Sequence, residues 1–177
     1  SGARPGPNFG KKCSGLLKSV LHKQFGDAVA DVILAGNASL HEAIDKAAKT
    51  IQRDPDTLCV IGCMDSLLNA STRDWLESGK RLFSSSFGRN HGLIAAEAAG
   101  FLIVEDMEKV KREGRPVLAL ISSLGLSKEQ NPRASDTSGI CTGLPEACQS
   151  ALDPIKNINI SKIFSDLNGE DDRAREW

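Results

Sequence analysis

The sequence has little net charge, few histidines and no long apolar run, and these shortages exclude several classes of protein. Its 177 residues carry 22 basic and 23 acidic side chains, for a net charge of −1. So weak a field draws neither nucleic acid nor an anionic membrane surface to the chain. No run approaches the roughly 18 apolar residues that span a bilayer. We therefore expect a cytoplasmic protein with no nucleic-acid or membrane partner.

The scatter of its 3 histidines and 5 cysteines predicts neither a metal site nor a cofactor. An odd number of cysteines with irregular spacing is typical of reduced thiols in a cytosolic protein. Cys59 and Cys63 fall in an apolar run, and we interpret them as residues of a buried strand. A metal would need more ligands near them than the sequence offers.

The composition is otherwise that of a globular domain, with 40% hydrophobic and 25% charged residues. Gly and Pro make residues 1–12 an irregular arm, and residues 13–177 are predicted to form one domain. Its polar, Gly/Pro/Ser-rich segment 127–142 is predicted to be a flexible loop. Periodic apolar residues predict helices at 16–25, 39–51, 69–76 and 145–152. Short apolar runs predict strands at 28–35, 57–63, 101–104, 117–124 and 160–167.

Two helix ends carry explicit signals. Gly26 is the predicted stop of the first helix. Ser39 followed by Glu42 fits a capping box, so Ser39 is predicted to cap the second helix. The alternation of buried strands with helices predicts an α/β layered fold.

Three stretches of the sequence resemble the N-terminal half of the β-ketoacyl synthases, which belong to the thiolase-like superfamily. Residues 87–100 read FGRNHGLIAAEAAG, similar to the family pattern FDxxRDGFVxGEGAG. Residues 101–114 read FLIVEDMEKVKREG, similar to the VLxLExLxxAxxRG that follows it. Residues 35–44 read AGNASLHEAI, where the family has its nucleophile segment ACATGLHAI. The resemblance covers roughly residues 28–170, and it implies a mixed sheet with helices on both faces, incomplete relative to the full family domain.

The same resemblance implies a fatty acid or polyketide acyltransferase whose catalytic residues are missing here. The family needs a cysteine thiolate activated at a helix N-terminus, and this chain has Asn37 there. Asn caps helices well but is not a nucleophile. Ser39 is the nearby hydroxyl, and His41 does not face it because residues two positions apart on a helix point in different directions. Residues 165–170 stand in place of the family's first catalytic histidine motif and contain no histidine.

Several polar residues could still belong to a pocket. Glu97 lies in a small, apolar stretch and needs a partner if buried; we weigh a structural ion pair against a supporting role near the site. Asp65 follows a predicted strand, either as part of a pocket or as a helix cap. The end of the last predicted strand either lines a pocket or forms a solvated turn and tail. Its polar residues are Asp166, Asn168, Glu170 and Arg173.

Three functions stay open at this point. The first is a pseudoenzyme that binds an acyl thioester or an acyl-carrier protein, or that serves as a structural partner. The second is an active 3-oxoacyl synthase with a non-standard nucleophile, for which Cys63 is the candidate, or with catalytic residues outside this chain. The third is an interaction module of a hetero-oligomer. The family's edge strand also predicts a homodimer through residues 29–36.

Overall fold

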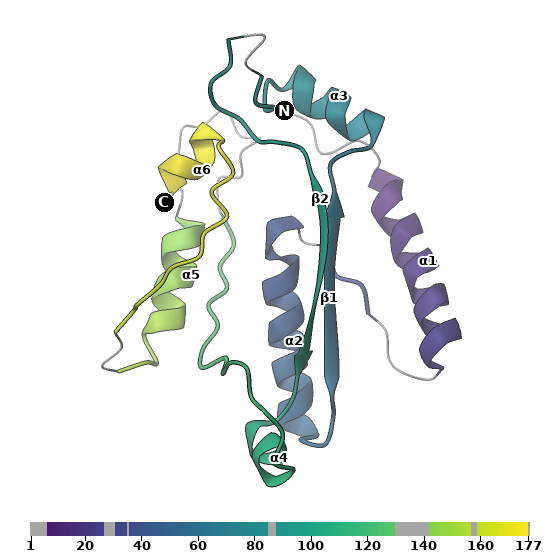
Figure 1. Cartoon of the computed structure of the whole chain (residues 1–177), viewed down its shortest axis with the longest axis vertical. Coiled ribbons are helices and arrows are strands. Elements are labelled where there is room, and N and C mark those ends of the chain that lie inside the picture. The colour runs from purple at the N-terminus through teal and green to yellow at the C-terminus, as the bar shows by residue number, and fades with distance from the viewer. Residues whose placement is uncertain are drawn as a thin grey trace.

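The computed structural model describes residues 7–26, 31–34, 36–84, 88–129, 142–156 and 159–176, without the side chains of residues 7–13, 37, 172, 175 and 176. Figure 1 shows helices around a narrow sheet, an arrangement compatible with the predicted α/β class. In chain order the elements are α1 (Pro7–Phe25), the 3-10 turn η1 (Gly36–Ala38), α2 (Ser39–Arg53), β1 (Cys59–Ser66), α3 (Ala70–Ser78), β2 (Glu97–Val104), α4 (Met107–Arg112), α5 (Gly143–Leu152) and α6 (Asp171–Glu176).

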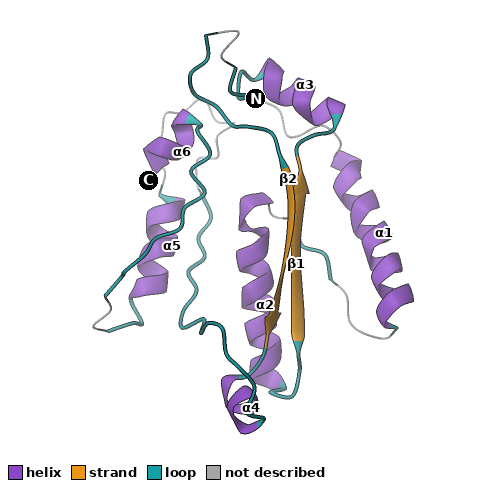
Figure 2. Ribbon diagram, viewed as in Figure 1, coloured by secondary structure: helices purple, strands orange, loops and turns teal. Residues whose placement is uncertain are grey.

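The sheet is formed by β1 and β2, which run antiparallel (Figure 2). Their register places Cys59 opposite Val104 and Ser66 opposite Glu97. Helix α2 packs against β1, as its position beside the strands in Figure 1 indicates. Buried apolar residues come from both elements: Ala47, Ile51 and Ile61. This helix-on-strand contact is the core of the lower half of the molecule as drawn.

Helix α2 forms where its apolar spacing predicted, but it begins differently. Its capping residue is Ala38, in helical conformation and without a side-chain capping bond, so the predicted capping box is wrong. The reason is that η1 has already wound residues 36–38, which places Ser39 inside the first helical turn. The predicted stop of α1 at Gly26 is confirmed: Gly26 has φ +63 and donates its N–H to the carbonyl of His22 at 2.9 Å.

Several strand predictions are wrong within the described residues. Segments 117–124, 160–167 and 31–34 form neither strand nor helix, whereas residues 28–30 and 35 lie outside the description. An apolar run becomes a strand only where a neighbouring segment supplies hydrogen-bond partners, and no described segment pairs with these runs as a strand. Phe164 is 90% exposed. The implied mixed sheet with helices on both faces is therefore not seen in the described part of the chain.

Other boundaries also move. Helix α1 starts at Pro7, so the predicted irregular arm is helical from that residue on; proline is favoured in a first helical turn because it lacks an N–H to leave unpaired. Strand β2 starts at Glu97 rather than at residue 101. Most of the predicted loop at 127–142 lies outside the described residues.

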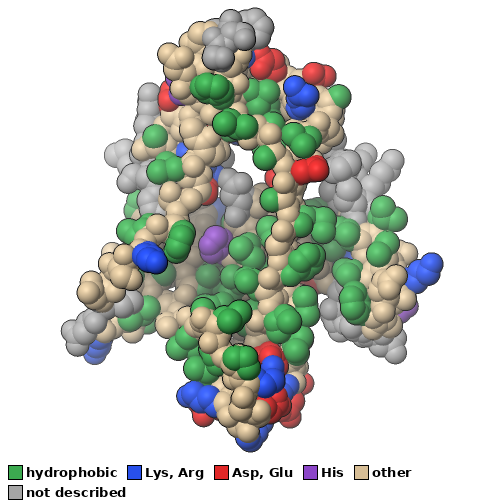
Figure 3. All heavy atoms as spheres, viewed as in Figure 1, with side chains coloured by type: hydrophobic (Ala, Val, Ile, Leu, Met, Phe, Trp, Pro, Cys, Tyr) green, Lys and Arg blue, Asp and Glu red, His purple; other side chains and the backbone are tan. Residues whose placement is uncertain are grey.

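The sheet face that points away from α2 is apolar and open among the described residues. The two residues of a cross-strand pair point to the same face of the sheet. Val60 and Ile103 form such a pair, and they point to the face away from the buried Ile61. Phe101 covers Gly62, where an added Cβ would stand 2.7 Å from the ring. Val60, Phe101, Ile103 and Met64 are all exposed. Figure 3 shows hydrophobic side chains along the two strands.

Asp31 ties the segment before α2 to two helices. Its carboxylate pairs with Lys46 of α2 and with Lys18 of α1, the latter at 3.4 Å, and accepts from the Val32 N–H at 2.9 Å. The hydrogen bond from Lys46, with those from Val32 and Lys18, lowers the pKa of Asp31 to about 2. The predicted homodimer through residues 29–36 uses this segment, and it stays a prediction.

Replacing Asp31 by asparagine should lower stability at neutral pH and should change its pH dependence. The folded-state pKa lies below the ordinary value of 3.8, so the carboxylate stabilises the fold above about pH 4 and loses this effect as the pH falls to about 2. Because the ion pair is solvent-exposed, we expect the substitution to lower the free energy of unfolding by at most about 1 kcal/mol at neutral pH. Urea unfolding of the wild type and the variant at pH 7 and at pH 2.5 measures this loss. A loss of the same size at both pH values would contradict the prediction.

Candidate functional site

The candidate site begins with a folded-back loop after α3. Phe83 donates its N–H to the carbonyl of Leu93, and Leu93 donates to the carbonyl of Arg81, both at 2.9 Å. Ser84 and Arg89 form an isolated antiparallel bridge. The loop therefore holds residues 81–84 beside residues 89–93. Leu93 is buried by this arrangement.

Two glycines let the C-terminal segment reach this loop. Gly92 donates its N–H to the Gly169 carbonyl at 2.7 Å. Their φ angles, +125 and +87, are ones that L side chains rarely adopt. A Cβ on Gly92 would stand 2.7 Å from the carbonyl oxygen of Arg81, and one on Gly169 would stand 2.6 Å from that of Gly92. The backbones approach this closely because neither residue has a side chain.

An ion pair fastens the same contact. Arg81 donates to both carboxylate oxygens of Glu170, at 2.6 and 3.2 Å, in a forked geometry. The guanidinium also lies over the ring of Trp75, 4.8 Å from its centroid. Asn168 donates its side-chain amide to Glu170 at 2.9 Å and accepts from the Glu170 N–H at 3.1 Å. Residues 166–169 are exposed, as the solvated-turn interpretation expects, whereas Glu170 is buried and departs from it.

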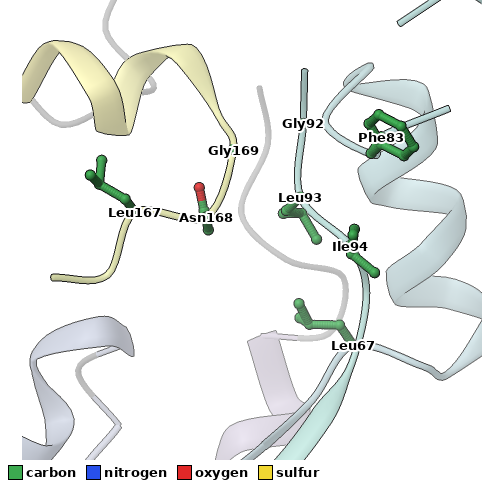
Figure 4. Close-up of a pocket in the computed structure, with 8 residues that line it drawn as sticks. All are labelled: Leu67, Phe83, Gly92, Leu93, Ile94, Leu167, Asn168 and Gly169. Carbon is green, nitrogen blue, oxygen red and sulfur yellow. The ribbon is translucent and has the colours of Figure 1, made fainter. Parts of the chain in front are cut away.

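A groove lies where the loop and the C-terminal segment meet (Figure 4). One hollow of about 430 Å³ is lined by Leu67, Phe83, Gly92, Leu93, Ile94, Leu167, Asn168 and Gly169. A second, of about 460 Å³, shares Phe83, Leu93 and Ile94 and adds Leu68, Arg73, Leu82 and Ala95. We call the two hollows together the groove. Each hollow has the size of a small-molecule site, which is roughly 300–1,000 Å³.

The described lining of the groove is mostly apolar and contains no nucleophilic side chain. Its lining is aliphatic and aromatic except for Arg73 and Asn168, and includes no cysteine, serine, histidine or carboxylate. Burying an alkyl chain in it would gain about 0.8 kcal/mol per methylene group. The described residues that line it therefore support binding and no covalent chemistry.

Of the residues predicted to form a pocket, the structure places Asn168 at the groove and leaves the others elsewhere. Asp166 pairs with Arg173 at 3.5 Å. Ser39 is half-buried in the first turn of α2, and the side chain of Asn37 lies outside the described residues. Asp65 does not cap α3; Asn69 does, by accepting from the Thr72 N–H at 2.9 Å.

Glu97 and the strand cysteines also differ from expectation. Glu97 is exposed and accepts a hydrogen bond from the Ser66 hydroxyl at 2.9 Å, so no burial forces an ion pair on it. Cys63 lies opposite Gly100 and is exposed, within β1 rather than at its end. Cys59 is half-buried, and this burial raises the pKa of its thiol. The prediction that both cysteines are buried is therefore wrong for Cys63.

The most important groove residues were not singled out from the sequence. Arg73 and Phe83 lie in a short helix and a loop with no motif around them. Arg81 and Glu170 are 89 positions apart, so no local spacing reveals their pairing. The available signal was the Asn168-Gly169 dipeptide, whose turn chemistry points to a special backbone conformation.

Comparison with protein-family models and with curated proteins gives no match. Among the described residues, no group of three or more potential metal ligands is brought together. None of the helices in the described ranges combines the length and the hydrophobicity that crossing a bilayer requires.

Proposed function

We propose that the chain is a non-catalytic protein of the thiolase-like, β-ketoacyl synthase type that binds an acyl chain in the groove. The observation that carries this proposal is an apolar groove whose described lining has no nucleophile, general base or carboxylate. An acyl chain matches that lining, and the resemblance to ketoacyl synthases names acyl groups as the relevant class. Delivery as an acyl thioester or on an acyl-carrier protein belongs to the same proposal.

Two features of the structure are compatible with the resemblance to ketoacyl synthases. The end of strand β2 and all of helix α4 lie within residues 101–114, the stretch similar to the family pattern VLxLExLxxAxxRG. Helix α2 begins at Ser39, two residues after Asn37, the position at which the family has its nucleophile. A cytoplasmic location is part of this proposal.

An active acyltransferase with Cys63 as nucleophile is the weaker alternative. Cys63 is exposed on β1 and is not among the residues that line the groove. Its thiol therefore has no acyl-binding surface described beside it. Incubation with malonyl and decanoyl thioesters separates the two ideas, because the non-catalytic protein yields no condensation product.

Replacing Ile94 by aspartate should weaken acyl binding by tenfold or more. Ile94 lines both hollows yet is 78% exposed, so a carboxylate there places charge beside the alkyl chain without disturbing the core. The probe is the N-acetylcysteamine thioester of decanoic acid, titrated by calorimetry.

The matched control is Ile163→Asp. Ile163 is 71% exposed, lies outside any helix or strand and does not line the groove. The control should bind the thioester as the wild type does. The proposal fails if the wild type binds no thioester, or if both variants lose binding equally.

A further inference from the structure

The C-terminal segment meets the loop of the groove at consecutive positions near its end. Residues 159–169 are all exposed and belong to no helix or strand, and the buried Glu170 follows them. The contacts with the loop join Gly169 to Gly92, Glu170 to Arg81 and Asp171 to His91. We call residues 166–171 the strap, because a long exposed segment is fastened there.

The loop side of this contact is held in place by interactions that do not involve the strap. Phe83 donates its N–H to the carbonyl of Leu93, and Leu93 donates to the carbonyl of Arg81, both at 2.9 Å. The Arg81 guanidinium lies 4.8 Å from the centroid of the Trp75 ring on α3. Departure of the strap breaks none of these interactions. The loop therefore keeps its shape when the strap leaves.

The strap also holds its own shape. Arg173 pairs with Asp166 at 3.5 Å and so joins the two sides of the turn. Asn168 donates its side-chain amide to the Glu170 carboxylate at 2.9 Å and accepts from the Glu170 N–H at 3.1 Å. Two pieces that are each formed internally, and that meet through a short contact, separate at a lower free energy than the whole fold unfolds.

We propose that the strap is a releasable wall of the groove, which opens while the loop stays folded. Leu167, Asn168 and Gly169 line the first hollow, whereas none of the described residues that line the second belongs to the strap. Figure 4 shows these three residues on one side of the first hollow and Leu93 and Ile94 on the other. Release of the strap therefore removes one wall of the first hollow and leaves the second intact. This goes beyond the proposed function and applies to any ligand of the groove.

Hydrogen exchange of three backbone amides, measured by NMR on the whole chain, tests the proposal. The Gly92 N–H donates to the strap, whereas those of Leu93 and Phe83 donate within the loop. We expect the Gly92 amide to exchange at least about tenfold faster than the other two, after correction for intrinsic rates, because strap opening alone exposes it. Equal protection of the three amides would overturn the proposal, because strap and loop would then open together.

The variant Glu170→Gln tests the fastening itself. It keeps the size of the side chain and removes the charge that pairs with Arg81. Hydrogen bonds to a charged group are stronger than those to a neutral one, so exchange of the Gly92 amide should become faster by about tenfold. Exchange at Leu93 and Phe83 should stay within about twofold of the wild type, because the loop is unchanged.

The matched control is Glu108→Gln, which also removes one carboxylate. Glu108 is exposed on α4 and pairs with Lys111 at 2.9 Å, so its replacement should leave all three amides unchanged. The proposal is refuted if Glu170→Gln accelerates the three amides equally or leaves Gly92 unchanged. If Glu170→Gln does not fold, the wild-type comparison alone decides. No ligand is present in these experiments, so their result is independent of acyl binding.

Discussion

Replacing Gly92 by alanine is expected to lower the free energy of unfolding by about 3 kcal/mol, because it forces a side chain into packed backbone. The new Cβ would stand 2.7 Å from both the Arg81 carbonyl oxygen and the Phe83 nitrogen. Neither atom can rotate away as a flexible side chain would. The φ angle of +125 adds backbone strain for any L side chain. Acyl binding should also be lost, since Gly92 holds the loop against Gly169 at the groove.

Gly88→Ala is the matched control for this variant. Gly88 also has a positive φ, +66, but a Cβ there meets nothing within 4 Å. Gly88→Ala should therefore lower the free energy of unfolding only by the strain of a left-handed residue, about 1 kcal/mol. Urea unfolding of both variants, with decanoyl thioester titrations, measures the difference. Equal losses of stability would show that strain and not the close backbone approach matters at Gly92.

The sequence predicted the helices of this fold better than its sheet. Periodic apolar residues predicted the positions of α2, α3 and α5. A helix forms its backbone hydrogen bonds within its own segment, so the spacing of its apolar residues is enough to locate it in the sequence. A strand needs partners from elsewhere in the chain. The apolar runs at 117–124 and 160–167 look the same in sequence as β1, and only β1 has a described partner, β2.

The groove could be predicted only in fragments, for a related reason. Asn168 was noticed because it follows an apolar run and precedes a glycine. Of the residues that line the groove with it, Phe83 lies in no motif, and Leu93 lies in the stretch 87–100 that resembles the family pattern without being predicted to line a pocket. The contact between these segments depends on Gly92 and Gly169, which no spacing rule connects. Residues that act through a distant backbone contact leave little trace in local sequence.

The proposed loss of catalysis and the proposed retention of a ligand site are compatible physically. Under the proposed resemblance, the nucleophile of a ketoacyl synthase would sit near the start of α2, at the position that Asn37 has in this sequence. The groove lies elsewhere, between α3, the loop after it and the C-terminal segment. The proposed binding of an acyl chain there depends on apolar area, which requires no activated thiol. A chain of this design can lose turnover and still select an acyl ligand.

The ion pair between Arg81 and Glu170 should show strongly unequal effects when its two members are removed singly. Glu170 has 9% of its side chain exposed and Arg81 has 30%. Replacing Arg81 by methionine leaves a carboxylate buried without its cation, which should cost about 3 kcal/mol. Replacing Glu170 by methionine should cost less, about 1–2 kcal/mol, because the freed guanidinium can turn towards water and stay over Trp75.

The double replacement decides whether this pair stabilises the fold or mainly positions the C-terminal segment. With both charges removed, no buried ion remains unpaired, so the double variant should be more stable than the sum of the single losses implies, by at least about 1 kcal/mol. Urea unfolding of the four proteins gives this coupling energy directly. Additive losses would mean that the two side chains act independently. If the double variant is stable but binds decanoyl thioester at least tenfold more weakly, the pair acts chiefly by holding Leu167 and Asn168 against the loop, because apolar packing can replace its energy but not its geometry.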